Sequence, residues 1–232
     1  MTSSQTDIQA IRQAIRQLSR FEREELAEWM LNSPDFEVRV AETALAYGGR
    51  HALTVEEYLQ LEEESAVRHE YVAGQIFAMT SPLIRHELIV ANLLCNFQSQ
   101  LRGGPCKALS SHTKVGFQVD RADIFYFPDL TVACGPFTEE VLDQRYLTNP
   151  CVVVEVLSAS TESIDRREKA LNYRHIPSLE EYLIVAQRSM EVTVLRRSEN
   201  WNARVMTGRE DVFESRAVEV NVALADIYEG VR

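Results

Sequence analysis

Two acidic residues lie in stretches of sequence where a carboxylate is energetically costly. Asp129 belongs to the apolar run at 124–134 (IFYFPDLTVAC), and Glu155 belongs to the run at 151–158 (CVVVEVLS). Both runs are rich in aromatic and β-branched residues and are apolar on both faces, which predicts central β-strands. An isolated buried carboxylate is strongly destabilising or takes up a proton, so each of these acids needs a compensating partner.

A divalent cation is one such partner. A third acid, Glu70, lies on a predicted hairpin strand, so Glu70, Asp129 and Glu155 are candidate ligands. Mg²⁺ and Mn²⁺ prefer oxygen ligands, and Mg²⁺ uses one or two carboxylates while it keeps several waters. A bound ion would neutralise the carboxylates, activate a water at neutral pH and stabilise charge on a phosphoryl oxygen. The three acids therefore predict a hydrolytic metal site.

Lys169 would be the fourth part of this site. It lies in a helix predicted over about 164–173, where Asp165, Lys169 and Tyr173 are spaced four residues apart and share one face. A lysine beside the metal would orient the attacking water or stabilise the charge that develops. The alternative is a solvated helix lysine that pairs only with Asp165.

The elements that must position these residues alternate between strands and helices. Thr54 and Glu57 form a capping-box pattern at the start of a helix. Residues 68–79 indicate a β-hairpin with its turn at Ala73-Gly74. A long helix is predicted at 83–101, ended by Gly103-Gly104-Pro105. Its buried stripe is expected to hold Ile84, Leu88, Ala91, Leu94 and Cys95.

Further strands follow this helix, which makes the main domain a mixed α/β or α+β sheet with the long helix on one face. A turn is expected at Arg121-Ala122-Asp123, a short helix within 137–146 and a last helical turn at 224–228. The strands are expected at 106–119, 124–134, 151–158, 181–186, 191–197, 201–206 and 217–220.

A helical extension, residues 1–50, precedes the main domain at 51–232. Apolar residues recur at helical spacing in two stretches, which predicts a helical hairpin. Such a hairpin would pack on the main domain or on another subunit, and packing on another subunit would give a homo-oligomer. The alternative is a small partner-binding or DNA-binding module. The first apolar stripe consists of Ile8, Ile11, Ile15 and Leu18.

Composition narrows the class of protein. The chain has 232 residues and a formal net charge of −11, which excludes a protein that coats nucleic acid through a broad basic face. A local basic groove remains possible, and the negative net charge suits a site that collects cations.

No apolar run is long enough to span a bilayer, and residues 1–7 lack a signal-peptide pattern, so we expect a cytoplasmic protein without a membrane partner. The four cysteines form no CxxC pair, and Cys134 and Cys151 are expected to be small core residues.

The acidic residues and their flanking sequences resemble the PD-(D/E)XK nuclease superfamily. More specifically, they resemble the Uma2-type endonucleases, also known as the DUF820 family, over about residues 54–230. Each motif alone is weak, and the ordered set is specific. The matching stretches are HEYVAGQI at 69–76, LRGGPC at 101–106, FPDLTVAC at 127–134, NPCVVVEVLSAST at 149–161, DRREKALNYR at 165–174 and PSLEEYLIV at 177–185.

The resemblance implies a restriction-endonuclease-like central sheet flanked by helices, and Mg²⁺- or Mn²⁺-dependent hydrolysis of phosphodiester bonds in DNA. It implies Glu70, Asp129 and Glu155 as metal ligands, and Asp129, Glu155 and Lys169 as catalytic residues. The chain departs from the superfamily pattern at Leu157, where a lysine is expected two residues after the glutamate. The family pattern implies that Lys169 replaces that lysine.

Three further residues are weaker candidates for substrate binding. His86 is near the start of the long helix, Ser158 follows the Glu155 strand, and Arg166 is in the helix with Lys169. Their structural alternatives are a histidine satisfied within the fold, a helix cap and an ordinary amphipathic helix. The same holds for the acids: Asp129 could simply end a strand, and Glu155 could pair with an arginine such as Arg121 or Arg174.

Two functional alternatives stay open from the sequence. The fold could serve as a nucleic-acid or protein-binding module with weak or no catalysis. The carboxylates and lysine could also serve another metal-dependent hydrolase, because they do not name the substrate.

Overall fold

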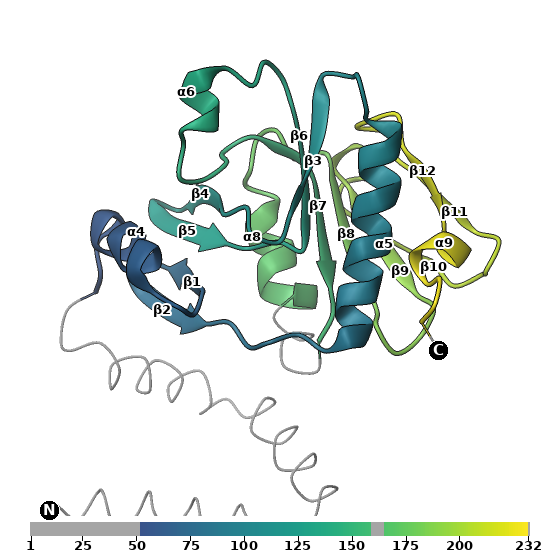
Figure 1. Cartoon of the computed structure of the whole chain (residues 1–232), viewed down its shortest axis with the longest axis horizontal. Helices are drawn as coiled ribbons and strands as arrows, with labels where there is room; N and C mark the ends of the chain where they lie inside the picture. The colour runs from purple at the N-terminus through teal and green to yellow at the C-terminus, as the bar shows by residue number, and fades with distance from the viewer. Residues whose placement is uncertain (1–51, 159–164, 232) are drawn as a thin grey trace, which may run out of the picture. The chain divides into compact units, whose positions relative to one another are not determined.

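Two larger β-sheets organise the part of the chain that the computed structural model describes, residues 52–158 and 165–231 (Figure 1). The mixed α+β class expected from the sequence is confirmed. The helical extension expected at 1–50 lies outside the described residues. No helix among the described residues is both long and apolar enough to cross a bilayer.

The first sheet has four antiparallel strands in the order β2-β1-β5-β4. Helix α4 (Val55–Glu64) packs on it through Tyr58, which shares a buried cluster with Tyr71 and Phe125. The predicted capping box is present, because Thr54 and Glu57 exchange hydrogen bonds. The strands are β1 (His69–Val72), β2 (Gln75–Ala78), β4 (Val115–Val119) and β5 (Ala122–Tyr126).

The hairpin between β1 and β2 turns where the sequence predicts. Ala73 and Gly74 have φ values of +51° and +92°. Two consecutive left-handed residues are typical of the tight turns that match strand twist, and glycine accepts this conformation without steric cost. The turn fixes the register that places Glu70 opposite Phe77.

The second sheet has six strands in the order β10-β9-β8-β7-β6-β3, and only the β7–β8 pair is parallel. Its centre carries Glu155, on β7. The strands are β3 (Cys106–Ser110), β6 (Leu130–Cys134), β7 (Pro150–Val156), β8 (Glu181–Val185), β9 (Val192–Arg196) and β10 (Ala203–Met206).

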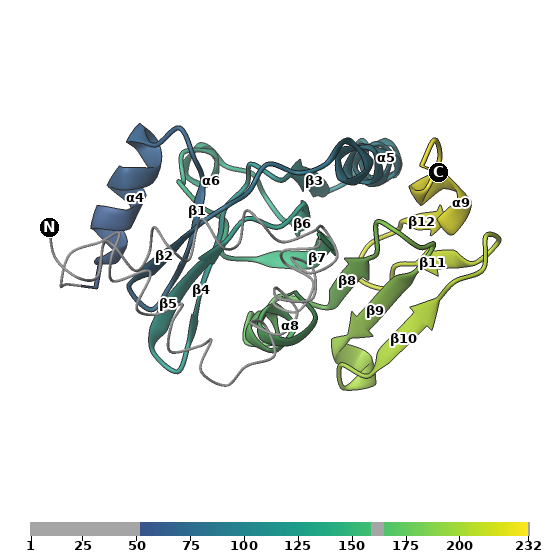
Figure 2. The same cartoon turned by 90° about the horizontal axis from the view of Figure 1, so that it is seen from below.

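Helices cover this sheet on both faces, as Figure 2 shows for α5 and α8. Val152, Val154 and Val156 of β7 belong to the core cluster under α5 (Ile84–Gln100). Val153 belongs to the opposite cluster, with Tyr173 of α8 (Ala170–Tyr173). Side chains alternate along a strand, so Glu155 points toward α8. A π-helical turn, Asp165–Lys169, leads directly into α8.

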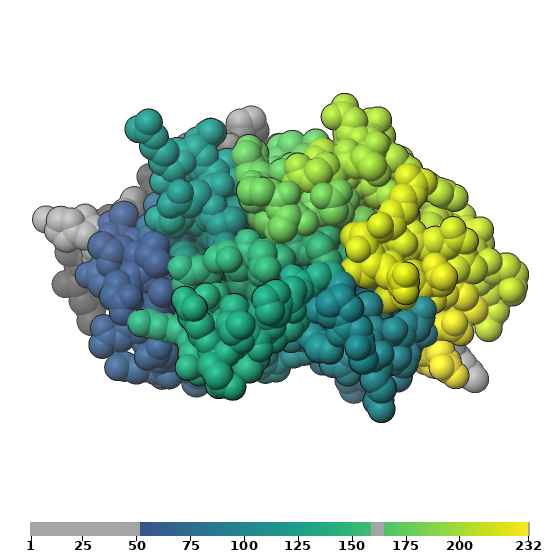
Figure 3. Space-filling model, turned by 90° about the horizontal axis from the view of Figure 1, so that it is seen from above, coloured from purple at the N-terminus to yellow at the C-terminus, as the bar shows by residue number. Residues whose placement is uncertain are grey.

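The C-terminal residues complete the layer that contains α5. Strands β11 (Val212–Glu214) and β12 (Asn221–Ala223) form a two-stranded sheet, followed by α9 (Leu224–Ile227). Asn92 of α5 donates hydrogen bonds to the carbonyls of Ile227 and Glu229, at 3.0 and 2.9 Å. Figure 3 shows the two segments side by side. Two short helical segments, α6 (Glu139–Leu142) and the 3₁₀ turn Arg197–Glu199, lie in connections.

Two predicted strands are wrong in extent. The run at 124–134 is broken at Phe127-Pro128-Asp129 into β5 and β6, which belong to different sheets. Proline has no N–H to donate to a strand ladder, and this break lets one run serve both sheets. The expected strand at 106–119 likewise divides into β3 and β4. The turn after it centres on Asp120 and Arg121, both with positive φ, so Ala122 and Asp123 already belong to β5.

Two other expectations are also wrong. Residues 217–220 are not a strand, and β11 and β12 lie to either side of them. Helix α5 buries a different face from the one expected, because Ile84 is 82% exposed. Cys134 and Cys151 pack against the core as expected, and Cys134 also forms a disulfide with Cys106 across the β3–β6 pair. The buried residues of α5 are His86, Ile89, Val90, Leu93 and Phe97.

Candidate active site

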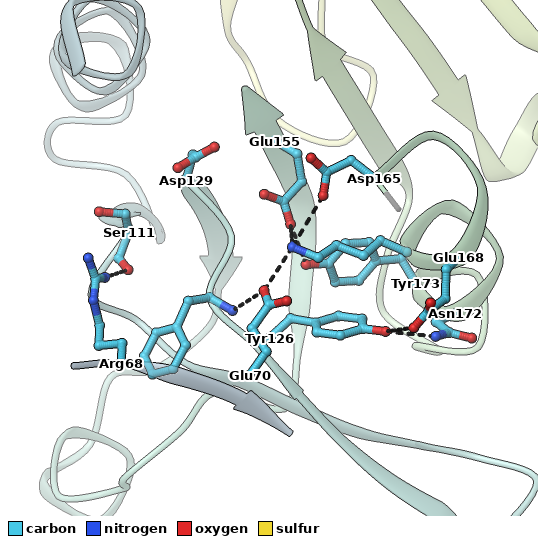
Figure 4. A network of polar contacts seen from close by, with 12 residues as sticks. Arg68, Glu70, Ser111, Tyr126, Asp129, Glu155, Asp165, Glu168, Asn172 and Tyr173 are labelled. Atoms are coloured by element: carbon cyan, nitrogen blue, oxygen red, sulfur yellow. Dashed lines mark hydrogen bonds and ion pairs between the residues drawn. The ribbon is translucent and has the colours of Figure 1, made fainter. Parts of the chain in front are cut away.

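Glu155 is the buried centre of the site. It is 4% exposed, and its Oε1 accepts hydrogen bonds from Lys169 Nζ at 3.1 Å and from the Tyr173 hydroxyl at 2.9 Å. Both partners come from the π-helical turn and α8, which cover that face of the sheet (Figure 4). Glu155 is therefore compensated by a lysine and a tyrosine, and neither Arg121 nor Arg174 is its partner.

Lys169 joins three carboxylates. Its Nζ lies 2.7 Å from Glu70 Oε1, 3.1 Å from Glu155 Oε1 and 3.3 Å from Asp165 Oδ1. The ammonium also lies over the Tyr126 ring, 5.1 Å from its centroid. Lys169 is 4% exposed, so it is not a solvated helix lysine. Asp165 is its i,i+4 partner, as the spacing predicts, but it is not the only one.

Glu70 reaches the site from the four-stranded sheet. Its carboxylate binds Lys169 and also accepts a 3.4 Å hydrogen bond from the backbone N–H of Phe127. Phe127 is the first residue of the break between β5 and β6. The contact therefore holds the β1 strand, the break and the helix after β7 together at one point.

Asp129 lies at the same end of the sheet as Glu155. Leu130 of β6 is opposite Val154 of β7, so the next residues outward are Asp129 and Glu155. Oδ2 of Asp129 accepts a hydrogen bond from the Val156 backbone N–H at 2.7 Å. Asp129 thus directly precedes β6, next to Glu155, and its role as a metal ligand stays a prediction.

His86 binds Asp129 from the first turns of α5. Its Nε2 lies 3.2 Å from Asp129 Oδ2, and the side chain is buried. Burial alone would lower the pKa of His86, but the hydrogen bond to Asp129 and the charge of Asp129 outweigh it and raise the pKa. The structure thus places His86 as a partner of Asp129, and contact with substrate stays a prediction.

The two other substrate-binding candidates lie at the edge of the described residues or face elsewhere. Ser158 directly precedes residues 159–164, which the structure does not describe. Arg166 donates a 2.9 Å hydrogen bond to Glu191, ahead of β9. The structure therefore brings together Glu70, Asp129, Glu155 and Lys169, while the guanidinium of Arg166 is directed to another partner.

Several polar residues of the site were not among the candidates. Tyr126, on β5, accepts a hydrogen bond from Asn172 at 2.8 Å and donates one to Glu168 at 3.2 Å (Figure 4). Tyr173 is fully buried, and its hydroxyl donates to Glu155. A sequence signal existed for Tyr173, since it shares a helix face with Asp165 and Lys169. None existed for Tyr126, which lies in an apolar run.

Negative charge is in excess at this site. Burial is the main cause that raises the pKa of Glu155 well above its ordinary value, and the carboxylates of Asp165, Asp129 and Glu70 add to it. Burial would lower the pKa of Lys169, but Glu155, Glu70 and Asp165 outweigh it and raise that pKa strongly. Four carboxylates thus face one permanently charged ammonium. An additional cation would relieve this imbalance.

The oxygen atoms of this site are of the type that hard divalent cations bind. Three oxygens form no hydrogen bond or ion pair with other described residues: Oε2 of Glu70, Oδ1 of Asp129 and Oε2 of Glu155. Each of these oxygens keeps some solvent exposure. Within residues 52–158 and 165–231, however, no three acidic, histidine or cysteine side chains already surround one point as ligands. The Lys169 ammonium instead bridges Glu70 and Glu155.

Comparison with known proteins identifies a family for this chain. The family model Uma2, described as "Putative restriction endonuclease", matches residues 55–225. The "Uncharacterized protein slr1290" of Synechocystis sp. (strain ATCC 27184 / PCC 6803 / Kazusa) is 34% identical over 180 residues, which cover 77% of this chain and 93% of that protein. The "Uncharacterized protein sll1609" of the same organism is 29% identical over 137 residues, or 58% of this chain and 75% of that protein.

A solved structure shares the fold. The crystal structure of "a putative nuclease belonging to DUF820" from Anabaena variabilis ATCC 29413 superposes with a TM-score of 0.64 and 18% sequence identity. The match covers 78% of this chain and 99% of that chain. At this identity the likeness shows the fold alone, and it confirms the fold expected from the sequence.

Proposed function

Because this chain belongs to the Uma2 family, we propose that it is a metal-dependent endonuclease that hydrolyses phosphodiester bonds in DNA. The family description and the nuclease-like fold support nuclease activity in general. The choice of DNA, and of Mg²⁺ or Mn²⁺ as the metal, is our proposal.

One observation carries the proposal. Glu70, Glu155 and Asp165 come from three separate segments and contact one lysine, and Asp129 lies beside Glu155. A stable core gains little from several buried carboxylates around a single ammonium, because removing charges from water is costly. Strongly perturbed ionisable groups of this kind are enriched at functional sites.

Asp129 and Glu155 would hold the metal, and Glu70 would assist. Their open oxygens are hard donors of the kind that Mg²⁺ and Mn²⁺ prefer. The ion, when bound, would supply Lewis-acid stabilisation of the phosphoryl oxygens and an activated water.

The chain's own residues would orient these groups and stabilise charge. Lys169, held protonated by its carboxylate neighbours, would donate hydrogen bonds to the phosphate oxygens on which negative charge develops. The Val156 N–H and His86 fix one oxygen of Asp129 and leave the other open. The Tyr173 hydroxyl does the same for Glu155. Preorganised partners of this kind keep ligand oxygens in place.

Metal binding is the first test. Calorimetric titration with MnCl₂ and MgCl₂ should give binding to the wild type, and Asp129→Asn and Glu155→Gln should each weaken it by at least about tenfold. Glu140→Gln, which changes an exposed carboxylate on α6, is the matched control and should leave binding unchanged.

Cleavage is the second test. Wild-type protein with Mg²⁺ or Mn²⁺ should cut supercoiled plasmid and linear duplex, and the two site variants should not. Metal binding without cleavage of DNA or RNA would point to a different hydrolase substrate. A wild type that binds no metal would overturn the proposal and favour a binding module on the same fold.

A further inference from the structure

Lys114 is a buried lysine outside the carboxylate site. It directly precedes β4, its carbonyl accepts a 2.8 Å hydrogen bond from the Leu147 N–H, and it is 8% exposed. Its Nζ keeps some contact with solvent. The lysine is thus held by the fold while its ammonium can be approached from outside.

The contacts of this ammonium are aromatic. Nζ lies 4.7 Å from the Tyr58 ring centroid and 5.5 Å from the Phe127 ring centroid. Within the described residues, no carboxylate or carbonyl oxygen lies at hydrogen-bond or ion-pair distance from it. Glu62 and Glu63 are near enough to influence it, but Glu62 binds His69 at 2.8 Å and Glu63 binds Arg145 at 3.4 Å. Lys114 is therefore a positive charge without an anionic partner.

Arg68 brings a second cation to the same ring. Its guanidinium carbon lies 5.6 Å from the Phe127 ring centroid, and its Nη1 donates a hydrogen bond to the Ser111 carbonyl. Ser111 belongs to the loop that leads to Lys114, so this bond ties the two cations to one loop. Both cations therefore border one aromatic ring, and a bound anion would supply the negative partner that neither cation has among the described residues.

The shared ring lies next to the candidate active site. Phe127 donates its N–H to Glu70 and is followed by Pro128 and Asp129. Figure 4 shows Arg68 and Ser111 on one side of Asp129, and Glu155 and Asp165 on the other. An anion bound at Arg68 would thus be separated from Glu155 and Asp165 by Asp129.

We infer that Lys114 and Arg68, arranged around the Phe127 ring, form a subsite for a backbone phosphate of the nucleic-acid strand, next to the phosphate that is cleaved. The inference rests on the proposed nuclease function and names the residues that would hold the strand. Phosphodiesters repeat along a strand at regular spacing, so an enzyme that acts on one phosphate is well served by cations that hold its neighbour. The subsite also gives an acidic chain a local positive contact for DNA.

Binding without catalysis separates this subsite from the metal site. Fluorescence anisotropy with a labelled short duplex, in EDTA and at several salt concentrations, measures affinity and its salt dependence for the full chain. Lys114→Met keeps the apolar stem and removes the charge. It should weaken binding for every sequence tested and reduce the slope of log K against log salt by about 1. Lys114→Arg should restore most of the affinity and most of the salt dependence.

The sequence offers a matched control. The chain has only three lysines, Lys107, Lys114 and Lys169, and Lys107 is exposed on β3 with its Nζ on the Gly104 carbonyl. Lys107→Met should leave affinity and slope unchanged. A second measurement needs no variant: bound duplex should protect Lys114 from acetylation, and Lys107 should stay reactive. Inorganic phosphate at the same phosphate concentration should protect far less if the strand is the ligand.

The outcomes are distinct from those of the metal and cleavage tests. Duplex binding with an unchanged slope in Lys114→Met and no protection of Lys114 would overturn the subsite and leave the nuclease proposal intact. A wild type that cleaves nothing but shows the Lys114-dependent slope would overturn the nuclease proposal and support strand binding alone. Equal protection by inorganic phosphate and duplex would contradict the nucleic-acid strand as the ligand and would indicate a site for small anions.

Discussion

The Lys169 ammonium lies 2.7 Å from Oε1 of Glu70, although the two residues are 99 positions apart in the sequence. Glu70 belongs to the four-stranded sheet, and Lys169 belongs to the turn that covers the six-stranded sheet. The contact is therefore a structural link between the two sheets as well as part of the candidate active site. A change at Lys169 should affect both stability and activity.

Lys169→Met should lower cleavage by about 10²–10³-fold, because it removes a charged donor from the reacting phosphate. It should also destabilise the metal-free protein by about 3–5 kcal/mol at neutral pH, since it leaves buried carboxylates without their cation. Urea unfolding and a plasmid cleavage assay measure the two effects. Lys107→Met, on the exposed surface, should change neither.

The stability loss in Lys169→Met should depend on pH in a defined direction. Burial, and then Asp165, Asp129 and Glu70, raise the pKa of Glu155, and loss of the ammonium should raise it further. A folded state that binds more protons than the unfolded state loses stability as pH rises. The loss relative to wild type should thus be smallest at acidic pH, where Glu155 is protonated in both folded proteins. It should grow as pH rises past the raised folded-state pKa of Glu155 in the wild type, because the unfolded-state pKa is the same in both proteins and cancels. A deficit that stays constant from acidic to neutral pH would contradict this account.

Local spacing in the sequence was sufficient for one half of the site. Asp165, Lys169 and Tyr173 follow helical spacing, and the structure directs Lys169 and Tyr173 to Glu155. The position of Glu155 in a central strand follows from its apolar neighbours on both faces. These relations depend on residues close in the chain, which is why periodicity could predict them.

The other half depends on long-range pairing. The run at 124–134 is apolar throughout, so its pattern cannot indicate that the two ends join different sheets. Helix α5 has apolar residues on several faces, and only the packing against β6 and β7 selects Ile89 and Leu93 over Ile84. The pairing of His86 with Asp129 depends on both of these features. It could not be predicted before the fold was known.

Tyr173→Phe tests how far Glu155 depends on its hydroxyl partner. The ring should keep its packing, with centroids 5.4 Å from Tyr126 and 5.1 Å from Tyr182. Loss of a hydrogen bond to a charged acceptor should cost about 1.5–3 kcal/mol of unfolding free energy. Tyr182→Phe, which removes a 3.0 Å bond to the neutral Asp165 carbonyl, should cost about 1 kcal/mol. Equal losses in the two variants would show that the charge on Glu155 does not strengthen its hydrogen bond with Tyr173.

Cysteine labelling tests the environment beside the disulfide. Burial raises the pKa of the Cys151 thiol to about 11, and its sulfur lies 3.6 Å from that of Cys134. At pH 8 only about one Cys151 in a thousand would be thiolate, the reactive form. Iodoacetamide should therefore label the exposed Cys95 first, and Cys151 should react only as pH rises toward 11 or after denaturation. Intact-mass spectrometry with tryptic mapping follows both sites. Rapid native labelling of Cys151 at pH 8 would be incompatible with this burial.

A second buried ion pair allows stability to be changed away from the active site. Arg196 donates a 2.8 Å hydrogen bond to Glu181, and Glu181 also accepts hydrogen bonds from Ser215 and from the Arg216 N–H. Both members of the pair are buried on neighbouring strands β8 and β9. Arg196→Met should destabilise the protein by about 3–5 kcal/mol, since it leaves Glu181 buried without its cation.

The double variant Glu181→Leu with Arg196→Met distinguishes the lost charge pair from lost packing. It should be more stable than Arg196→Met alone, because no buried charge remains without a partner. Urea unfolding measures the difference, and Arg145→Met, at an exposed pair with Glu56, should show no measurable change. Metal affinity at temperatures where each variant is folded should match wild type, since Glu181 and Arg196 have no contact with Glu155 or Lys169. A double variant no more stable than Arg196→Met would show that the arginine acts mainly through packing.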